Sequence, residues 1–192
     1  MALNDQSTRI RDGEELDAAI IDSYLKAHIP GLSGEPQISQ FPGGASNLTY
    51  LLEYPQQEFV LRRPPFGHKA KSAHDMGREY RILNQLNAGF PYCPKAYVHC
   101  TDESVIGAEF YVMQRVNGII LRADLPAELN FSPAQTSQLC KSFIDKLVEL
   151  HNVDYQACGL GDLGKPEGYV ARQISGWSDR YEKALTPDAP LW

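Results

Sequence analysis

Short β-strand patterns joined by turns of hairpin length constrain this fold more than any other feature of the sequence. Strands are expected over 37–41, 48–54 and 58–63, and the turns between them are rich in Pro, Gly, Ser, Asn and Gln. Parallel strands need a crossover of a dozen or more residues, so links this short predict an antiparallel meander. The first turn, 42–47, could be a plain hairpin turn or a cradle in which backbone N–H groups hold a phosphate.

Helical patterns and further strands flank this meander. Helices are expected at 14–27, with Asp12 as the cap and an apolar stripe that includes Leu16 and Ile20, at 72–87, at 133–151 and around 170–184. Two more strands are expected at 95–100 and 108–115. The order predicts an α+β fold, in which a five-stranded antiparallel sheet is backed by the helix at 72–87 and followed by a helical region.

Composition and charge exclude several classes of protein. The chain has 192 residues, of which 43% are hydrophobic and 22% charged, as in ordinary globular domains. A net charge of −6 argues against a nucleic-acid partner, and no stretch is long and apolar enough to span a membrane. The four cysteines lack Cys-x-x-Cys spacing and the N-terminus lacks a secretory pattern, so we expect no zinc site and a cytoplasmic location.

Charged residues on the third strand and the next helix suggest a buried pair. Arg62 and Arg63 end the strand and point to opposite faces by alternation. Either both are solvated edge charges, or Arg62 pairs with Glu79 on the following helix. We expect Arg62 and Glu79 to face each other, because an unpaired buried charge would be strongly destabilising.

The order of these features is that of the small lobe of a protein kinase, in which a Gly-rich loop covers the phosphates and a cation–Glu pair orients them. Seven stretches of the sequence indicate which family of kinase-like proteins the chain resembles. They are GGASNLTY (43–50), VLRRPP (60–65), REYRIL (78–83), FYVMQRVNG (110–118), LHNVDY (150–155), GLG (159–161) and GKPEGY (164–169). Through them the chain resembles the aminoglycoside phosphotransferase family of kinase-like small-molecule phosphotransferases. It is most similar to the subgroup whose domain is fused to acyl-CoA dehydrogenases.

This resemblance implies an ATP site. The residues that would form it are Gly43, Gly44, Ser46, Asn47, Val60, Arg62, Glu79, Met113, Gln114, Arg115 and Val116. Those at 43–47 would cover the phosphates, and Val60 would touch the adenine. Arg62 would replace the family's third-strand Lys, with Glu79 as its partner. Met113 would be the gatekeeper, and the backbone of 114–116 would be the adenine-binding hinge.

The family's catalytic loop, His-Gly-Asp-x-x-x-x-Asn, and its later metal-binding Asp have no match here. Gly161-Asp162 follows Leu160 instead of His, and Glu167 takes the Asn position. We therefore expect no catalytic residue and no metal ligand in this chain, although Mg²⁺ is expected for the full-length family. The expected organisation is a kinase-like N-lobe at 1–116, followed by a hinge and an incomplete helical C-lobe at 117–192 that stops before the catalytic loop.

Three hypotheses follow for the function. The first is the nucleotide-binding half of an ATP-dependent phosphotransferase, inactive alone, whose acceptor is a small-molecule hydroxyl; the fusion suggests a hydroxyacyl thioester. The second is a non-catalytic nucleotide-binding or regulatory module, and the third an α+β protein without a nucleotide site. We also expect self-association or poor solubility, because the helix at 133–151 carries a wide apolar arc, formed by Leu139, Cys140, Phe143, Ile144, Leu147, Val148 and Leu150.

Overall fold

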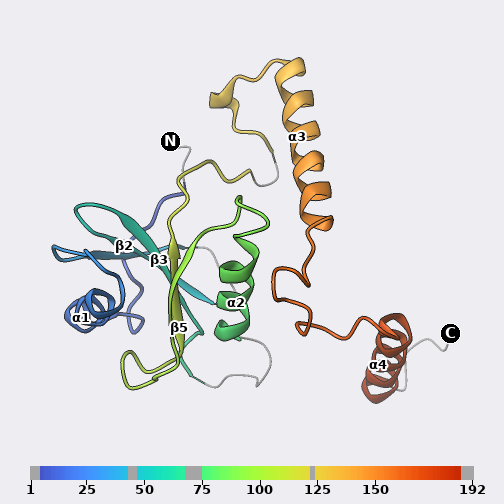
Figure 1. The fold of residues 1–192 in the computed structure, drawn as a ribbon, viewed down its shortest axis with the longest axis horizontal. Helices are drawn as coiled ribbons and strands as arrows, with labels where there is room; N and C mark the ends of the chain where they lie inside the picture. Colours follow the sequence, from blue (N-terminus) through green and yellow to red (C-terminus); the bar gives the residue numbers. More distant parts are fainter. Residues whose placement is uncertain (1–4, 43–46, 68–74, 122–123, 187–192) are drawn as a thin grey trace. The chain divides into compact units, whose positions relative to one another are not determined.

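The computed structural model describes residues 5–42, 47–67, 75–121 and 124–186. Their contacts divide the chain into two units, 1–154 and 155–192; the lobe boundary expected after residue 116 stays a prediction. The elements are α1 (Ala18–His28), β1 (Gln37–Gln40), β2 (Leu48–Glu53), β3 (Glu58–Arg63), α2 (Met76–Leu86), β4 (Ala96–Cys100), β5 (Phe110–Gln114), a 3₁₀ turn (Ala127–Leu129), α3 (Pro133–His151) and α4 (Tyr169–Ala184) (Figure 1).

The strands form one five-stranded antiparallel sheet in the order β1-β2-β3-β5-β4, as the hairpin-length turns predict. Register fixes which side chains share a face. Arg62 lies between Thr49 on β2 and Tyr111 on β5, and Val60 lies between Leu51 and Met113. Because alternate residues share a face, both rows lie on the same side of the sheet, about 7 Å apart along the strands.

The two faces of the sheet are covered differently. On one face, buried residues of β2, β3, β4 and β5 pack with Ile21 and Leu25 of α1 in the main hydrophobic core. On the other face, α2 lies against β4 and β5 (Figure 1). Phe41, Leu51 and Val60 form a separate small cluster there, with Met113 packed against it.

The first helix starts later than the sequence pattern predicts. Asp17, not Asp12, is its cap, and the Asp17 carboxylate accepts hydrogen bonds from the backbone N–H groups of Ala19 and Ile20. The expected apolar stripe is also shifted, because Ile20 is 45% exposed whereas Ile21 is fully buried. The residues before Asp17 instead run beside the sheet, where Thr8 forms an antiparallel bridge with Gln40.

Arg63 is a buried arginine, so the interpretation of both strand-end arginines as solvated charges is wrong for this residue. Its side chain is 1% exposed. Nε donates to the Pro64 carbonyl at 3.2 Å, Nη1 donates to the Ile106 carbonyl at 2.9 Å, and the guanidinium lies over the Phe66 ring. Arg63 therefore ties the end of β3 to the loop between β4 and β5.

The helix α3 begins with the predicted capping box. The Ser132 hydroxyl accepts from the Gln135 backbone N–H, and the Gln135 side chain accepts from the Ser132 backbone N–H. None of the residues of α3 is buried, and Phe143 is 67% exposed. In the unit 155–192, α4 likewise has no buried residue, while Leu160 is buried in the segment before it. Among the described residues, no helix is long and apolar enough to cross a membrane.

Candidate nucleotide site

Glu79 on α2 gathers polar groups from three other parts of the chain. Arg62 Nη1 lies 3.5 Å from Glu79 Oε2, which confirms that this pair faces each other. The Tyr111 hydroxyl on β5 donates to the same oxygen at 2.9 Å, and the Asn47 side-chain amide donates to Oε1 at 3.0 Å. The carboxylate is thus held by one cation and two neutral donors.

The side chains around the Glu79 carboxylate are partly shielded from solvent. Arg62 and Glu79 are each one-third exposed at the side chain, whereas Tyr111 is fully buried. Burial raises the pKa of the Tyr111 hydroxyl well above its ordinary value, and the carboxylate of Glu79 adds to this. Tyr111 therefore stays protonated and remains a donor to Glu79 at any physiological pH.

Two buried donors lack partners. Among the residues that the structure describes, the buried side-chain N and O atoms without a hydrogen bond are Nε of Arg62 and Nε of Arg115. A buried donor that stays unpaired costs about 1–3 kcal/mol. Arg62 belongs to the predicted phosphate end of the site and Arg115 to the predicted hinge, so both unpaired atoms belong to residues of the predicted site, although each atom is itself covered by protein.

An apolar row lies on the same face of the sheet as the Arg62–Glu79 pair. Val60 on β3 is paired with Met113 on β5 and with Leu51 on β2, and Phe41 completes the cluster. Phe41, Leu51 and Val60 are buried, and Met113 is the partly exposed member of the row. Apolar side chains thus lie beside a charged pair, and a nucleotide needs this combination for its base and its phosphates. The structure thus brings Val60, Met113, Arg62, Glu79 and Asn47 to one face.

The predicted hinge is only partly free to bind a base. The Gln114 backbone N–H donates to the Lys95 carbonyl at 2.8 Å and is thereby used by the sheet. Val116 is exposed, and Arg115 is half-buried. The predicted phosphate-loop residues Gly43, Gly44 and Ser46 lie outside the described residues.

The sequence analysis did not predict that Tyr111 donates a hydrogen bond to Glu79. The signal was present, because alternation places Tyr111 on the same face as Met113. In the described part of the chain, no group of three or more His, Cys, Asp or Glu residues is placed to hold a metal ion.

The comparisons with known proteins agree with this architecture. Residues 37–192 match the sequence profile of the phosphotransferase enzyme family (APH). Acyl-CoA dehydrogenase family member 11 of Gallus gallus is 37% identical over 196 residues, covering 99% of this chain and 25% of that protein. The Homo sapiens protein of the same name is 36% identical over 92% of this chain and 23% of its own length. The probable acyl-CoA dehydrogenase IBR3 of Arabidopsis thaliana is 31% identical over 97% of this chain and 23% of its own length.

A solved structure matches the fold directly. The crystal structure of a candidate aminoglycoside phosphotransferase from Ralstonia eutropha JMP134 superposes with a TM-score of 0.75 at 35% identity, covering 90% of this chain and 49% of that one. The chain thus spans about a quarter of the curated relatives and about half of this solved structure. The fold and the family profile define a kinase-like phosphotransferase domain. This chain belongs to the phosphotransferase enzyme family, and its relatives include the acyl-CoA dehydrogenase fusions that the sequence motifs indicate.

Proposed function

We propose that this chain is the nucleotide-binding half of an ATP-dependent small-molecule phosphotransferase, which transfers the γ-phosphate to a hydroxyl group. The observation that carries the proposal is the Arg62–Glu79 pair, whose two side chains are each one-third exposed. A phosphate oxygen is the kind of acceptor that an exposed guanidinium N–H fits, because guanidinium groups bind phosphates through charge-assisted hydrogen bonds.

Each residue of the site has a positioning role in this proposal. Glu79 holds the Arg62 guanidinium by charge, and Tyr111 and Asn47 fix the Glu79 carboxylate so that it cannot swing away. Arg62 then orients the phosphates, while Val60 and Met113 give the base an apolar wall. When bound, ATP with Mg²⁺ supplies the phosphoryl group and the charge neutralisation that such transfers need.

No catalytic base or metal ligand is assigned to this chain. In the described residues no group of three or more His, Cys, Asp or Glu is placed to hold a metal ion. The alternative is a module that binds nucleotide without catalysis. Turnover in the presence of a hydroxyl acceptor separates the two.

The acceptor and the location are further parts of the proposal. Relatives named as acyl-CoA dehydrogenases favour a hydroxyacyl thioester over an aminoglycoside as the acceptor. A cytoplasmic location is part of the same proposal, and the four free cysteines, which suit a reducing compartment, support it. A panel of hydroxyacyl thioesters and aminoglycosides, each assayed for ATP-dependent phosphorylation, distinguishes the acceptor classes.

Calorimetric titration of the purified chain with Mg-ATP tests the proposal. We expect binding by the unmodified chain, a loss of about tenfold or more for Arg62→Ala, and recovery of most affinity for Arg62→Lys, which keeps the charge. Arg78→Ala, which removes an exposed arginine of the same helix as Glu79, is the matched control and should bind normally. An unmodified chain that binds no ATP would contradict the proposal.

A further inference from the structure

The segment 5–15, called the strap here, lies along the open edge of the sheet. The Thr8 backbone N–H donates to the Gln40 carbonyl at 2.7 Å, and the Gln40 N–H donates to the Thr8 carbonyl at 3.0 Å. The Ser39 hydroxyl donates to that of Ser7 at 2.8 Å. The strap therefore extends the sheet beyond β1, although it precedes the part of the chain that matches the family profile.

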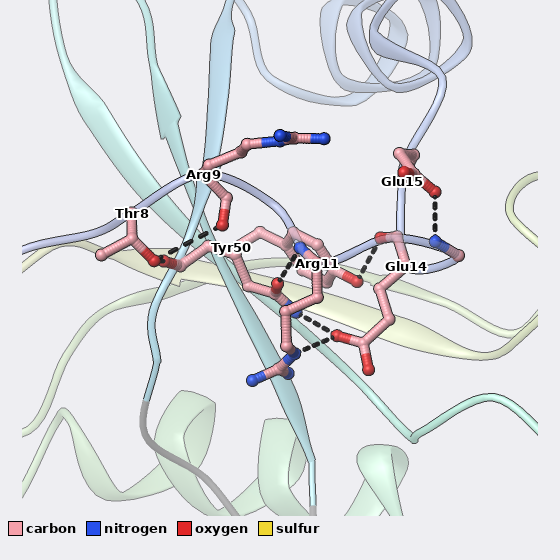
Figure 2. A network of polar contacts seen from close by, with 8 residues as sticks. Thr8, Arg9, Arg11, Glu14, Glu15 and Tyr50 are labelled. Atoms are coloured by element: carbon pink, nitrogen blue, oxygen red, sulfur yellow. Dashed lines mark hydrogen bonds and ion pairs between the residues drawn. The ribbon is translucent and has the colours of Figure 1, made fainter.

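Gln40 is the residue that fastens the strap most firmly. Its side chain is 1% exposed; it accepts from the Arg11 backbone N–H at 2.9 Å and donates to Glu14 at 2.6 Å. Arg11 and Tyr50 complete the network, since the Arg11 guanidinium bonds the Glu14 carboxylate and the Tyr50 hydroxyl donates to the Glu14 carbonyl (Figure 2). Gln40 directly precedes Phe41, so the network fixes the strand that enters the glycine-rich turn.

The other end of the strap holds Arg115 in the predicted hinge. Arg115 Nη2 donates to the Asp5 carbonyl at 2.8 Å, and the guanidinium lies 4.7 Å from the centre of the Phe41 ring. Phe41 belongs to the same apolar cluster as Val60 and Met113. The guanidinium is thus fixed on two sides at the apolar end of the site, while Arg115 itself stays partly exposed.

We propose that Arg115, held in place by the strap, binds the nucleoside end of the nucleotide. A planar cation fixed against an aromatic ring at an apolar wall presents a donor to the acceptor atoms of a purine or a ribose. Arg62 and Arg115 then bind opposite ends of the same ligand, each through the part of its side chain that stays exposed. This inference rests on the proposed function, and it adds a binding role for the Arg115 side chain and a positioning role for residues 5–15.

The test compares two probes, ATP and inorganic tripolyphosphate, by titration of the full chain. Arg115→Ala should weaken ATP binding about tenfold, as expected for a lost charge-assisted hydrogen bond, and should leave tripolyphosphate binding unchanged. Arg115→Lys should recover part of the ATP affinity. Removal of residues 1–6, which takes away the Asp5 carbonyl, should have the same selective effect as Arg115→Ala and should speed hydrogen exchange at the Gln40 amide.

Arg9→Ala is the matched control within the strap, because the Arg9 side chain is exposed and forms a surface ion pair with Asp12. It should bind both probes normally. If Arg115→Ala binds ATP as the unmodified chain does, or loses both probes equally, the role of Arg115 is overturned. If the unmodified chain binds tripolyphosphate and not ATP, the proposed binding of a nucleoside at Arg115 is overturned, whereas the proposed binding of phosphates at Arg62 is not. If it binds neither, the proposed function itself fails.

Discussion

Two consecutive arginines on β3 have different surroundings, because alternate residues of a strand point to opposite faces of the sheet. Arg62 shares the α2 face with Glu79, whereas Arg63 is buried on the opposite face near Tyr50 and Glu14. Burial lowers the pKa of Arg63, and Tyr50 and Glu14 oppose that change. Arg63 therefore stays charged in the core by hydrogen bonding two carbonyls.

Glu14 should make the chain sensitive to acid. The hydrogen bond from Gln40 and the charge of Arg11 lower the pKa of the Glu14 carboxyl below its ordinary value of 4.5. The unfolded chain then binds a proton more readily than the folded one, so the free energy of unfolding falls as pH drops from about 5 through that lowered pKa. Above that window the stabilisation from Glu14 is fully present.

Urea unfolding at pH 7 and at successive steps down to pH 3 checks this expectation. Glu14→Gln should be less stable than the unmodified chain at pH 7, and the difference should shrink in acid. The control is Glu35→Gln, which removes an exposed glutamate outside the network. A difference between the unmodified chain and Glu14→Gln that stays constant with pH would show that Glu14 gains no stabilisation from its charge.

At the scale of elements, the packing of α1 gives a prediction with a built-in control. Ile21 is fully buried against the sheet, and its neighbour Ile20 is 45% exposed. Ile21→Ala should lower the free energy of unfolding by about 2–5 kcal/mol, because it leaves a cavity in the core. Ile20→Ala should change it by less than about 1 kcal/mol. Equal losses from the two changes, measured by urea unfolding, would contradict the observed face of α1.

The elements also show where sequence could predict structure and where it could not. The antiparallel sheet could be predicted from the hairpin-length links, and the start of α3 from the capping box of Ser132 and Gln135, because both signals are local in the sequence. The start of α1 was predicted wrongly, because the sequence pattern pointed to Asp12 as the cap and the structure uses Asp17. The residues before Asp17 are held at the sheet by the pairing of Thr8 with Gln40, 32 residues away, and no local pattern signals that contact.

The same limit applies to the site. Alternation and helical spacing predicted that Arg62 and Glu79 face each other, since each position depends on its own element. The contact of Asp5 with Arg115 could not be predicted, because it joins a backbone carbonyl, which every residue carries, to an arginine 110 residues away. The burial of Arg63 was missed for a similar reason, because one of its hydrogen-bond acceptors, the Ile106 carbonyl, lies 43 residues away.

On the scale of the whole molecule, the exposed apolar side chains of α3 support the expected self-association. Phe143, Ile144 and Val148 are each more than half exposed. Apolar surface is worth roughly 25 cal/mol per Å² when it is buried, so covering this face with a second copy would be favourable. We expect sedimentation of the purified chain to show dimers or larger species.

A pair of charge variants tests this expectation. Phe143→Glu should shift the chain to monomer, because a charge cannot be buried in an apolar contact. Lys141→Glu, at an exposed polar position of the same helix, should leave the association state unchanged. A monomeric unmodified chain at all accessible concentrations would show that α3 does not mediate self-association.

The distance in sequence between Asp5 and Arg115 also sets an order in time. A ribosome adds about 5–20 residues per second, so Arg115 is made roughly 5–20 s after Asp5. Gln40 follows Thr8 by 32 residues, a delay of only about 2–6 s. During synthesis the strap can therefore pair with β1 well before its end is fastened at the hinge. The strap is thus made well before the hinge residue that fastens its far end.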